Sequence, residues 1–396
     1  MKDKSSLDIL FFAEDPGAAN YLVDMPLRCR AEGFRYKVIA ESLARGFFRE
    51  TEVPYEDVEG SDDPGDLLRR FNSRLLVVGT SENPRSLGLK LVETARKKGM
   101  ATLGVVDAFM NAAYRFRGLG EDPLRFAPEW IAVPDAWTQS AFLDLGHPSD
   151  RVVICGHPRY DAVRQRSLQL RGRGREAVRR RIFPDAGPEK PIVLFASELS
   201  EGLNPSQFTW SEEYGLSGWG ESRLRTPIVL EEFLEAVDHL PDRPYLALRL
   251  HPKEHRGDFT AYLDRFDRVS QREPVLEVIF ASDFVVGLTS TLLLEACLVG
   301  RPTLSILPRE AEREWLPTVR AGLTRCATTR EELQALLPGF LSGLETKHVP
   351  KCDDVFVFGA LGRVITLIKS ILGIPVPIPA GSAKKTRHRD GAIPCT

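Results

Sequence analysis

Three consecutive hydroxyl side chains, Thr289, Ser290 and Thr291, separate two apolar segments and form the pattern most suggestive of chemistry. The segment before them is short and β-branched, and the segment after them predicts a compact helix that carries one acid, Glu295. Free N–H groups and the positive end of the helix dipole meet at such a helix start, so phosphate or another anion is favoured there. A buried acid needs a polar partner, and the hydroxyls of a ribose would provide one. This segment therefore predicts a site for a nucleotide or a phosphorylated ligand.

Two further polar groups in the second half of the chain follow apolar runs in the same way. His251 and Lys253 flank a proline directly after YLALRL, and Ser197 and Glu198 follow IVLFA. Because proline ends the strand, it holds the histidine ring at the strand's edge. Imidazole, ammonium and hydroxyl groups all bind anions, so we expect this half of the chain to bind the phosphate of a ligand.

The first half of the chain offers mainly acids at the equivalent positions. Glu14, Asp15 and Gly17 follow ILFFA, and Asp107 and Asn111 follow TLGVV. Open parallel sheets bind ligands beyond the carboxyl ends of their strands, and a carboxylate there can take a proton from a hydroxyl. We predict a cleft with acids on one wall and anion-binding groups on the other. Such a cleft suits the transfer of a group from a nucleotide-bound donor to a hydroxyl acceptor.

Each of these groups also has a structural interpretation. The acids after the first strand, and the hydroxyls at 290 and 291, could simply cap the helices that they precede. His251 could be a satisfied structural histidine, and Lys253 could be a solvated surface lysine. His157 and Arg159, near the middle of the chain, could belong to a hinge or to the cleft.

The elements that must position these residues are apolar runs that alternate with helical patterns. The runs are uniformly apolar, as expected for parallel strands that are covered by helices on both faces. We therefore expect an α/β protein with two doubly wound Rossmann-like domains that face each other across a cleft. The predicted strands are Ile9–Ala13, Tyr36–Ala40, Leu75–Gly79, Thr102–Val106, Trp130–Val133, Val152–Cys155, Ile192–Ala196, Tyr245–Leu250, Phe284–Gly287 and Thr303–Leu307.

Four parts are expected along the chain. Residues 1–158 would form the first Rossmann-like domain, on the acceptor side, and residues 159–350 the second, on the side of the nucleotide donor. Residues 351–373 would form a C-terminal helix that packs back on the body of the protein. Residues 374–396 are rich in Pro, Gly, Lys and Arg and are expected to be disordered.

Three segments each allow two interpretations. Residues 164–181 contain eight arginines, which form either a solvated helix face or a patch for anionic lipid or a phosphorylated acceptor. The amphipathic stretch 356–372 is expected to pack on the protein, and an interfacial membrane helix is the alternative. The long loop 198–225 could cover the donor or help to form the acceptor site, with aromatic rings that stack on a sugar or base, or it could be a surface insertion.

Composition narrows the class of protein. The chain has 396 residues, of which 43% are hydrophobic and 27% charged, and its net charge of -2 argues against nucleic-acid binding. Its 6 cysteines show no metal-ligand spacing, so we expect small core residues in a reducing cytosol. No signal peptide or membrane-spanning run is evident. We expect a cytoplasmic protein, with peripheral membrane contact left open.

Two sequence patterns resemble those of a known superfamily. The stretch SDFVVGLTSTLLLEACLVGRPTLSI is similar to the donor-domain signature of GT-B-fold glycosyltransferases and nucleotide-sugar 2-epimerases. The stretch PEWIAVPDAWTQSAFLDLGHPSDRVVICGHPRYD resembles the end of their first domain. The resemblance covers roughly residues 8–370. An acidic-glycine element, a His-Pro motif and a serine/threonine motif resemble those of bacterial sialyl-, Kdo- and polyol-phosphate transferases, although a proline interrupts the first of these here.

The resemblance implies roles for the reacting groups. Asp15 or Glu14 would be the general base that deprotonates the acceptor hydroxyl. His251 would contact the donor phosphate and stabilise the leaving nucleotide. The acidic and histidine catalytic set of the epimerases is not recognisable in the sequence.

The resemblance also implies how the donor is held. Ser290 and Thr291 would hold the phosphate, and Glu295 would bind the ribose hydroxyls. Enzymes of this kind generally need neither a metal nor a cofactor, because the helix dipole and side chains neutralise the leaving group. The nucleotide sugar is then a co-substrate, and a glycan or lipid-linked molecule is the expected acceptor.

Three functions are compatible with this pattern. The leading hypothesis is a GT-B-type glycosyltransferase that moves a sugar or polyol phosphate, in bacterial surface polysaccharide or glycoconjugate synthesis. A nucleotide-sugar 2-epimerase or hydrolase on the same scaffold is the second. A non-catalytic binding protein is the third.

Overall fold

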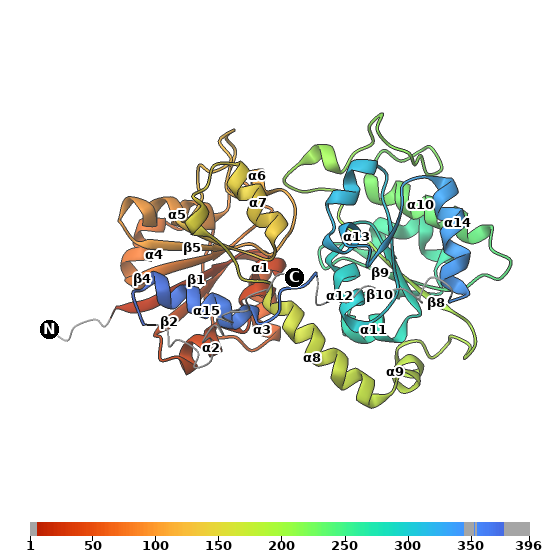
Figure 1. Cartoon of the computed structure of the whole chain (residues 1–396), viewed down its shortest axis with the longest axis horizontal. Coiled ribbons are helices and arrows are strands. Elements are labelled where there is room, and N and C mark those ends of the chain that lie inside the picture. Colours follow the sequence, from red (N-terminus) through yellow and green to blue (C-terminus); the bar gives the residue numbers. More distant parts are fainter. Residues whose placement is uncertain (1–5, 344–351, 353–354, 376–396) are drawn as a thin grey trace, which may run out of the picture.

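Two parallel β-sheets, each covered by helices on both faces, form the two lobes of the molecule (Figure 1). The computed structural model describes residues 6–343, 352 and 355–375. Every pairing between its named strands is parallel. The expected α/β class with two Rossmann-like domains is confirmed.

The strand order in each sheet reverses direction beside its first strand, as in doubly wound folds. The first sheet runs β3 (Glu56–Asp57), β2 (Tyr36–Ala40), β1 (Leu7–Ala13), β4 (Ser73–Gly79), β5 (Ala101–Val105), β6 (Trp130–Val133) and β7 (Val152–Ile154). The second sheet runs β10 (Arg268–Ser270), β9 (Tyr245–Arg249), β8 (Ile192–Ala196), β11 (Phe284–Gly287), β12 (Thr303–Ile306) and β13 (Arg325–Ala327).

Helices connect the strands in both lobes. Those before β8 are α1 (Pro16–Leu22), α2 (Met25–Ala31), α3 (Ser42–Glu50), α4 (Pro64–Phe71), α5 (Leu87–Lys97), α6 (Ala112–Arg115), α7 (Ala136–Asp144), α8 (Pro158–Arg173) and α9 (Arg175–Ile182). Those after β8 are α10 (Arg225–Asp238), α11 (Val275–Ala281), α12 (Thr291–Val299), α13 (Pro317–Arg320), α14 (Arg330–Leu341) and α15 (Ala360–Ile371). Short 3₁₀ helices span Ser149–Arg151, Pro205–Gln207, Arg256–Arg265 and Glu310–Glu314.

The apolar strands bury both of their faces, which explains why the sequence shows no alternation of polar residues. In β1, Ile9 and Phe11 pack into a core with α1, α2 and α3, whereas Leu10 and Phe12 pack with α4 and α5 on the opposite face. All four side chains are fully buried. Because side chains point alternately to the two faces of a strand, a strand between two helical layers must be apolar at every position.

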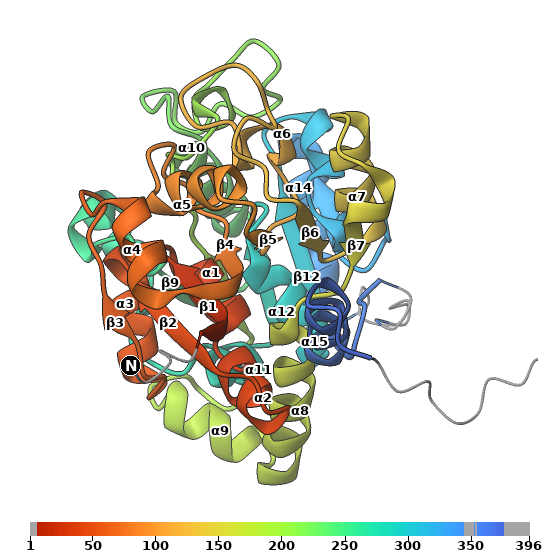
Figure 2. The same ribbon diagram turned by 90° about the vertical axis from the view of Figure 1, so that its left-hand side faces the viewer.

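The chain crosses between the lobes twice. Helix α8 begins beside α1 of the first lobe and packs against α11 and α12 of the second, and α15 returns to the first lobe beside α2. Figure 2 shows α15 next to α8 and α2. Asp161 on α8 accepts hydrogen bonds from the N–H groups of Gly359 and Ala360 and so caps α15. At its other end, Lys369 pairs with Glu32 at 2.6 Å.

The apolar face of α15 is already occupied. Val364, Ile365, Leu367 and Ile368 are buried in the core of the first lobe. An interfacial membrane helix, the alternative interpretation of this segment, would need that face to be exposed. Among the described residues, no helix is both long and apolar enough to cross a bilayer.

Ten strands were predicted, and all ten are present with ends that agree within about two residues. The prediction missed three short strands at or near sheet edges, β3, β10 and β13, which contain two or three residues each. Such strands are too short to show an apolar run. Of the tail expected to be disordered, only residues 374 and 375 lie within the described part of the chain.

Candidate functional site

A cleft of about 300 Å³ lies between the lobes, where the carboxyl ends of the central strands of both sheets meet. Loops after β1, β4, β5 and β7 line it from one side, and loops after β8, β9 and β11 line it from the other. The lining residues are Asp15, Pro16, Gly17, Asn20, Thr80, Glu82, Asp107, Ala108, Met110, Asn111, Arg115, His157, Arg159, Tyr160, Glu198, Leu199, Glu201, Gln207, Phe208, Arg225, His251, Lys253, Thr289, Ser290, Thr291, Glu295 and Trp315.

Asp107 lies at the cleft wall, where its carboxylate contacts the hydroxyl of Thr80 and the backbone of Gly17. The hydroxyl of Thr80 donates to Asp107 Oδ1 at 2.5 Å. Asp107 Oδ2 approaches Gly17 so closely that a Cβ at position 17 would lie 1.9 Å from it, so no residue with a side chain fits there without displacing the carboxylate. Burial raises the pKa of Asp107, and the Arg115 charge and the Thr80 hydrogen bond only partly oppose this. A half-buried carboxyl with a raised pKa is a suitable proton acceptor near neutral pH.

Asp15 lies at the same wall but both of its oxygens are engaged. Oδ1 pairs with Lys253 Nζ at 2.9 Å, and Oδ2 accepts the Glu82 N–H at 2.6 Å. The pair with Lys253 links the two lobes across the cleft. Asp15 is therefore placed more as a bridge than as a free base.

Two other contacts join the first lobe to the loop at 198–225. Asn111, in the left-handed conformation at the start of α6, donates from Nδ2 to Gln207 Oε1 at 3.0 Å. Glu82 accepts from Arg115 at 2.8 Å through one oxygen and from the Leu203 N–H at 3.0 Å through the other. These contacts hold the loop 198–225 over one end of the cleft.

Stacking on a ligand was one of the two interpretations of the aromatic residues Trp210, Tyr214 and Trp219 in the loop 198–225, and none of the three lines the cleft. Trp219 packs on Tyr262, Trp210 lies under Arg223, and Tyr214 lies under Arg309. The aromatic residues that do line the cleft are Tyr160, Phe208 and Trp315.

Hydrogen bonds of its backbone N–H and of its ring hold His251 at the end of β9. Its N–H donates to Glu254 Oε2 at 2.8 Å and to the Ser197 hydroxyl at 3.2 Å, and its Nδ1 accepts the Lys253 N–H at 3.1 Å. Burial, together with the Lys253 charge, lowers the pKa of His251 to about 4, against a smaller opposing effect of Asp15. The ring is therefore neutral near pH 7, and with Nδ1 as an acceptor its proton lies on Nε2.

The helix start at α12 carries the three hydroxyls. Ser290 is the N-cap and accepts the Leu292 N–H at 3.2 Å. Thr289 points its hydroxyl to Glu198 Oε2 at 3.0 Å, whereas Thr291 is exposed in the first turn. Capping does not prevent anion binding here. Ser290 caps α12, and the N-terminus of this helix still faces the cleft.

Glu295, one turn further along α12, forms an ion pair with Arg159 of α8. Arg159 donates to both of its oxygens, at 2.8 and 3.2 Å. Arg159 N–H in turn donates to Nδ1 of His157, whose buried ring lies against Tyr21 and Tyr160 and whose pKa burial lowers to about 3. His157 and Arg159 thus line the cleft, and Arg159 joins α8 to α12.

A buried charge network that the sequence analysis missed lies behind Thr289. Arg225, of which 1% is exposed, pairs with Glu198 at 2.9 Å and with the fully buried Glu312. Arg309 also pairs with Glu312, at 2.8 Å, and donates to the carbonyl of Gln207. Arg225 is the first residue of α10 and precedes the apolar run 228–230, and this position was the only signal available in the sequence.

The charges of the cleft are almost fully paired. Arg115, Arg159, Arg225 and Lys253 each pair with a different carboxylate. Among the described residues of the lining, only Asp107 and the exposed Glu201 remain without a basic partner. The expected division into an acidic wall and an anion-binding wall is therefore less sharp than predicted, since each wall carries both signs.

Eleven of the 13 predicted site residues line the cleft, and two do not. Glu14 is buried behind it, where Oε1 accepts from Asn83 at 2.6 Å. Ser197 is buried too and accepts the His251 N–H, so it positions the histidine loop. The described residues contain no group of acids, histidines and cysteines that could hold a metal ion.

Comparison with known proteins identifies the fold. No family model and no curated protein matches the sequence. The structure is similar to UDP-GlcNAc 2-epimerase from Neisseria meningitidis bound to UDP-GlcNAc, with a TM-score of 0.66 and 14% identity over 93% of this chain and 100% of that one. It is also similar to S. aureus MnaA in complex with UDP, with a TM-score of 0.65 and 13% identity over 94% and 99% of the chains.

A glycosyltransferase from Rickettsia africae is similar over 93% of this chain and 99% of its own, with a TM-score of 0.58 and 10% identity. These likenesses span both lobes. The chain therefore has the same two-domain α/β fold as these proteins, the GT-B fold that the sequence patterns suggested.

Proposed function

We propose that the protein is an enzyme that binds a nucleotide-activated sugar in the cleft and acts on the bond between its phosphate and its sugar. The observation that carries this proposal is the meeting of His251 and the N-terminus of α12 with Asp107 in one cleft. Anion-binding groups come from the second lobe and an unpaired acid comes from the first. The names of similar solved structures, which include complexes with UDP-GlcNAc and UDP, support the ligand class.

The second lobe would hold the leaving nucleotide. The N-terminus of α12 attracts negative charge through its dipole and free N–H groups. His251, neutral and protonated on Nε2, can donate a hydrogen bond to a phosphate oxygen without carrying a charge of its own. Glu295 is held by Arg159 at both oxygens, and its remaining lone pairs can accept ribose hydroxyls.

The first lobe would hold the reacting acceptor. Asp107 is a better candidate base than Asp15 because it has a raised pKa and no basic partner. Proton removal from an acceptor hydroxyl as the sugar is transferred fits the leading hypothesis of a glycosyltransferase. A glycan or lipid-linked molecule of bacterial surface polysaccharide synthesis is the acceptor class that we propose.

A nucleotide-sugar 2-epimerase or hydrolase is the second candidate. The specific observation in its favour is that several of the similar solved structures carry the name UDP-GlcNAc 2-epimerase. In that case Asp107 would remove a proton from the sugar itself or activate a water molecule. Incubation of a donor without any acceptor separates the two: an epimer or a free sugar favours the second candidate, and an intact donor favours the transferase.

A binding screen tests the shared part of the proposal. UDP, CDP, CMP and their sugar derivatives would be added to the full chain, and a ligand that binds the folded state raises its melting temperature. Binding without turnover of any donor would favour a non-catalytic binding protein. Failure of all these compounds to bind would contradict the proposal.

His251→Leu tests the role of the histidine. We expect donor turnover to fall about 100-fold or more, because leucine cannot donate the hydrogen bond to the developing charge. His239→Leu is the matched control, since His239 is an exposed histidine outside the cleft lining. Equal turnover by the two variants would remove His251 from the mechanism.

A further inference from the structure

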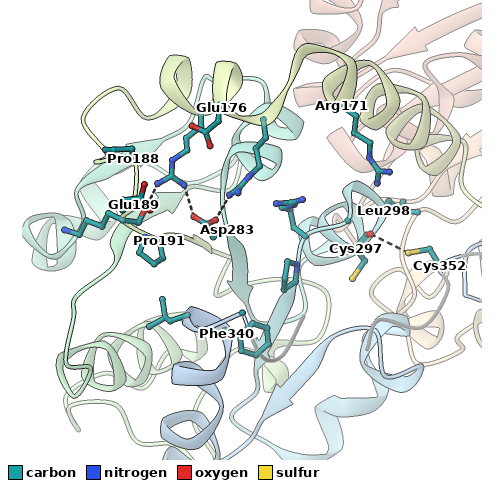
Figure 3. A pocket seen from close by; sticks show the side chains of 18 residues that line it. Arg171, Glu176, Pro188, Glu189, Pro191, Asp283, Cys297, Leu298, Phe340 and Cys352 are labelled. Atoms are coloured by element: carbon teal, nitrogen blue, oxygen red, sulfur yellow. Dashed lines mark hydrogen bonds and ion pairs between the residues drawn. The ribbon is translucent and has the colours of Figure 1, made fainter. Parts of the chain in front are cut away.

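A second and larger cavity lies away from the cleft, on the face of the second lobe where α8, α9 and the end of α12 meet. Its volume is about 890 Å³ (Figure 3). The lining has an apolar part, which includes Leu298, Phe340 and three prolines, and a charged part in which bases outnumber acids. The bases are Arg171, Arg175, Arg179, Lys190 and Arg301, and the acids are Glu176, Glu189 and Asp283. The arginine-rich stretch 164–181, which the proposed reaction does not use, contributes three of these arginines.

Two of the four arginines are neutralised within the cavity wall. Arg175 and Arg179 pair with the two oxygens of Asp283, at 2.6 and 2.8 Å. Figure 3 shows these interactions around Asp283. Both oxygens of this carboxylate are thereby engaged, so Asp283 makes no ion pair with Arg171 or Arg301.

Arg171 and Arg301 have no carboxylate partner among the described residues. Arg171 points from the last turn of α8 toward the start of the loop after α12 (Figure 3), and one of its nitrogens comes within 3.2 Å of the position that a Cβ on Gly300 would take. Arg301 follows that glycine directly. Its Nε is buried and makes no hydrogen bond within the described part of the chain.

The positive charges reinforce one another at Arg301. Burial lowers the pKa of its guanidinium, and the charges of Arg175 and Arg171 lower it further, with Asp283 opposing them. A half-buried donor without an acceptor costs free energy. The protein thus keeps an unfavourable concentration of positive charge at a cavity large enough for a small molecule.

An interaction with the C-terminal end of a helix does not by itself account for Arg171 and Arg301. Arg171 and Arg301 lie at the C-terminal ends of α8 and α12, where cations are favoured by the helix dipole. Neither guanidinium, however, donates to a carbonyl among the described residues. A cation that served only the helix end would interact with those carbonyls.

We propose that this cavity is a second ligand site, separate from the cleft, for a small phosphate-bearing anion that Arg171 and Arg301 bind. A phosphate accepts hydrogen bonds from both guanidinium groups and neutralises their charge. The prolines, Leu298 and Phe340 leave room for an apolar part of the same molecule. A phosphorylated metabolite and the headgroup of an anionic phospholipid share this chemistry.

The cavity and the cleft lie at opposite ends of the same two helices. Helix α8 runs from Arg159 in the cleft to Arg171 in the cavity, a distance of about 18 Å at 1.5 Å per residue. Helix α12 runs from Thr291 in the cleft to the cavity residue Leu298. The two sites are therefore too far apart for one small phosphate to occupy both.

Calorimetric titration of the full chain with inorganic pyrophosphate tests the site. We expect the double variant Arg171→Gln/Arg301→Gln to bind pyrophosphate at least 10-fold more weakly than the wild type. Arg180→Gln is the matched control, because Arg180 is an exposed arginine on α9 outside the cavity lining, and we expect its affinity to stay within two-fold. His251→Leu, which removes a hydrogen-bond donor from the cleft, should leave this binding event intact.

A vesicle experiment identifies the source of the phosphate. Wild type, the double variant and Arg180→Gln would be sedimented with phosphatidylglycerol and with phosphatidylcholine vesicles. Binding to phosphatidylglycerol that only the double variant loses identifies a lipid headgroup. Loss of pyrophosphate binding without a difference in vesicle binding identifies a free phosphorylated molecule.

Two results would overturn the proposal. One is the absence of any binding by either probe. The other is binding that His251→Leu abolishes and the double variant retains, which would place it in the cleft. Because the second site does not depend on nucleotide-sugar binding, it can fail while the proposed function stands, and the reverse is also possible.

Discussion

The cleft and the outer cavity occupy opposite ends of α8 and α12, but they treat positive charge in opposite ways. In the cleft, Arg159 pairs with Glu295 at 2.8 Å, and three other basic side chains also have carboxylate partners. In the cavity, Arg171 and Arg301 have none among the described residues. Ion pairs fix the positions of the side chains that form them. Charged side chains without such a pair instead favour a ligand of opposite charge. In the cleft the exceptions are acids, Asp107 and the exposed Glu201, and in the cavity the exceptions are bases.

The largest expected effect comes from removing the unpaired acid of the cleft. Asp107→Asn should lower turnover by about 10²- to 10⁴-fold, because an amide cannot accept the proton. Donor binding should change little, since the Thr80 hydroxyl can still donate to the amide oxygen. Steady-state kinetics together with calorimetry of the donor measure both. Glu201→Gln, the other acid of the lining without a basic partner, is the control, and a similar loss in both variants would contradict the assignment of Asp107.

The paired charges should matter for stability instead. Arg225→Met leaves Glu198 without its basic partner and Glu312 with Arg309 alone, and should lower the free energy of unfolding by about 3–5 kcal/mol. Arg243→Met, which breaks a more exposed pair with Asp267, should lower it by about 1 kcal/mol or less. Urea unfolding of both variants gives the comparison. Equal losses would mean that burial does not distinguish the two pairs.

Stability should also depend on pH through His251. Its pKa is about 4 in the folded protein and about 6.5 in the unfolded chain. Between these values the unfolded chain binds a proton that the folded protein does not, so stability is complete above pH 6.5 and falls as the pH drops toward 4. The slope of unfolding free energy against pH should be smaller in His251→Gln than in the wild type. His239→Gln should keep the wild-type slope, and a wild-type slope in His251→Gln would argue that this ring is exposed.

The smallest expected effect is at the outer cavity. Arg301→Gln removes a charge that has no carboxylate partner among the described residues and that lies 5.9 Å from the centroid of the Phe280 ring. The free energy of unfolding without ligand should therefore change by no more than about 0.5 kcal/mol. Chemical denaturation measures this in buffer free of phosphate. A loss of about 2 kcal/mol or more would show that Arg301 stabilises the fold, and the contrast between cleft and cavity would then disappear.

Much of the fold could be predicted because it depends on local patterns. A run such as IVLFA between two helical patterns can only be a strand that is buried on both faces, and β8 has the predicted bounds Ile192–Ala196. Short edge strands such as β3 and β13 were missed, because their pairing depends on neighbours and not on their own composition. The amphipathic pattern of α15 indicated that one face is buried, but not that it lies against α2 of the first lobe.

The sequence by itself determined which residues stand at the ends of strands, and the topology of parallel sheets then brings those residues to one edge. This is why His251, Ser290 and Asp107 line one cleft as predicted. Only the tertiary structure decided their partners. It paired Asp15 with Lys253 across 238 positions and Arg159 with Glu295 across 136, and it left Arg171 and Arg301 without a carboxylate among the described residues. Charge pairing depends on distances of a few ångströms between segments far apart in the chain, and no local pattern records those distances.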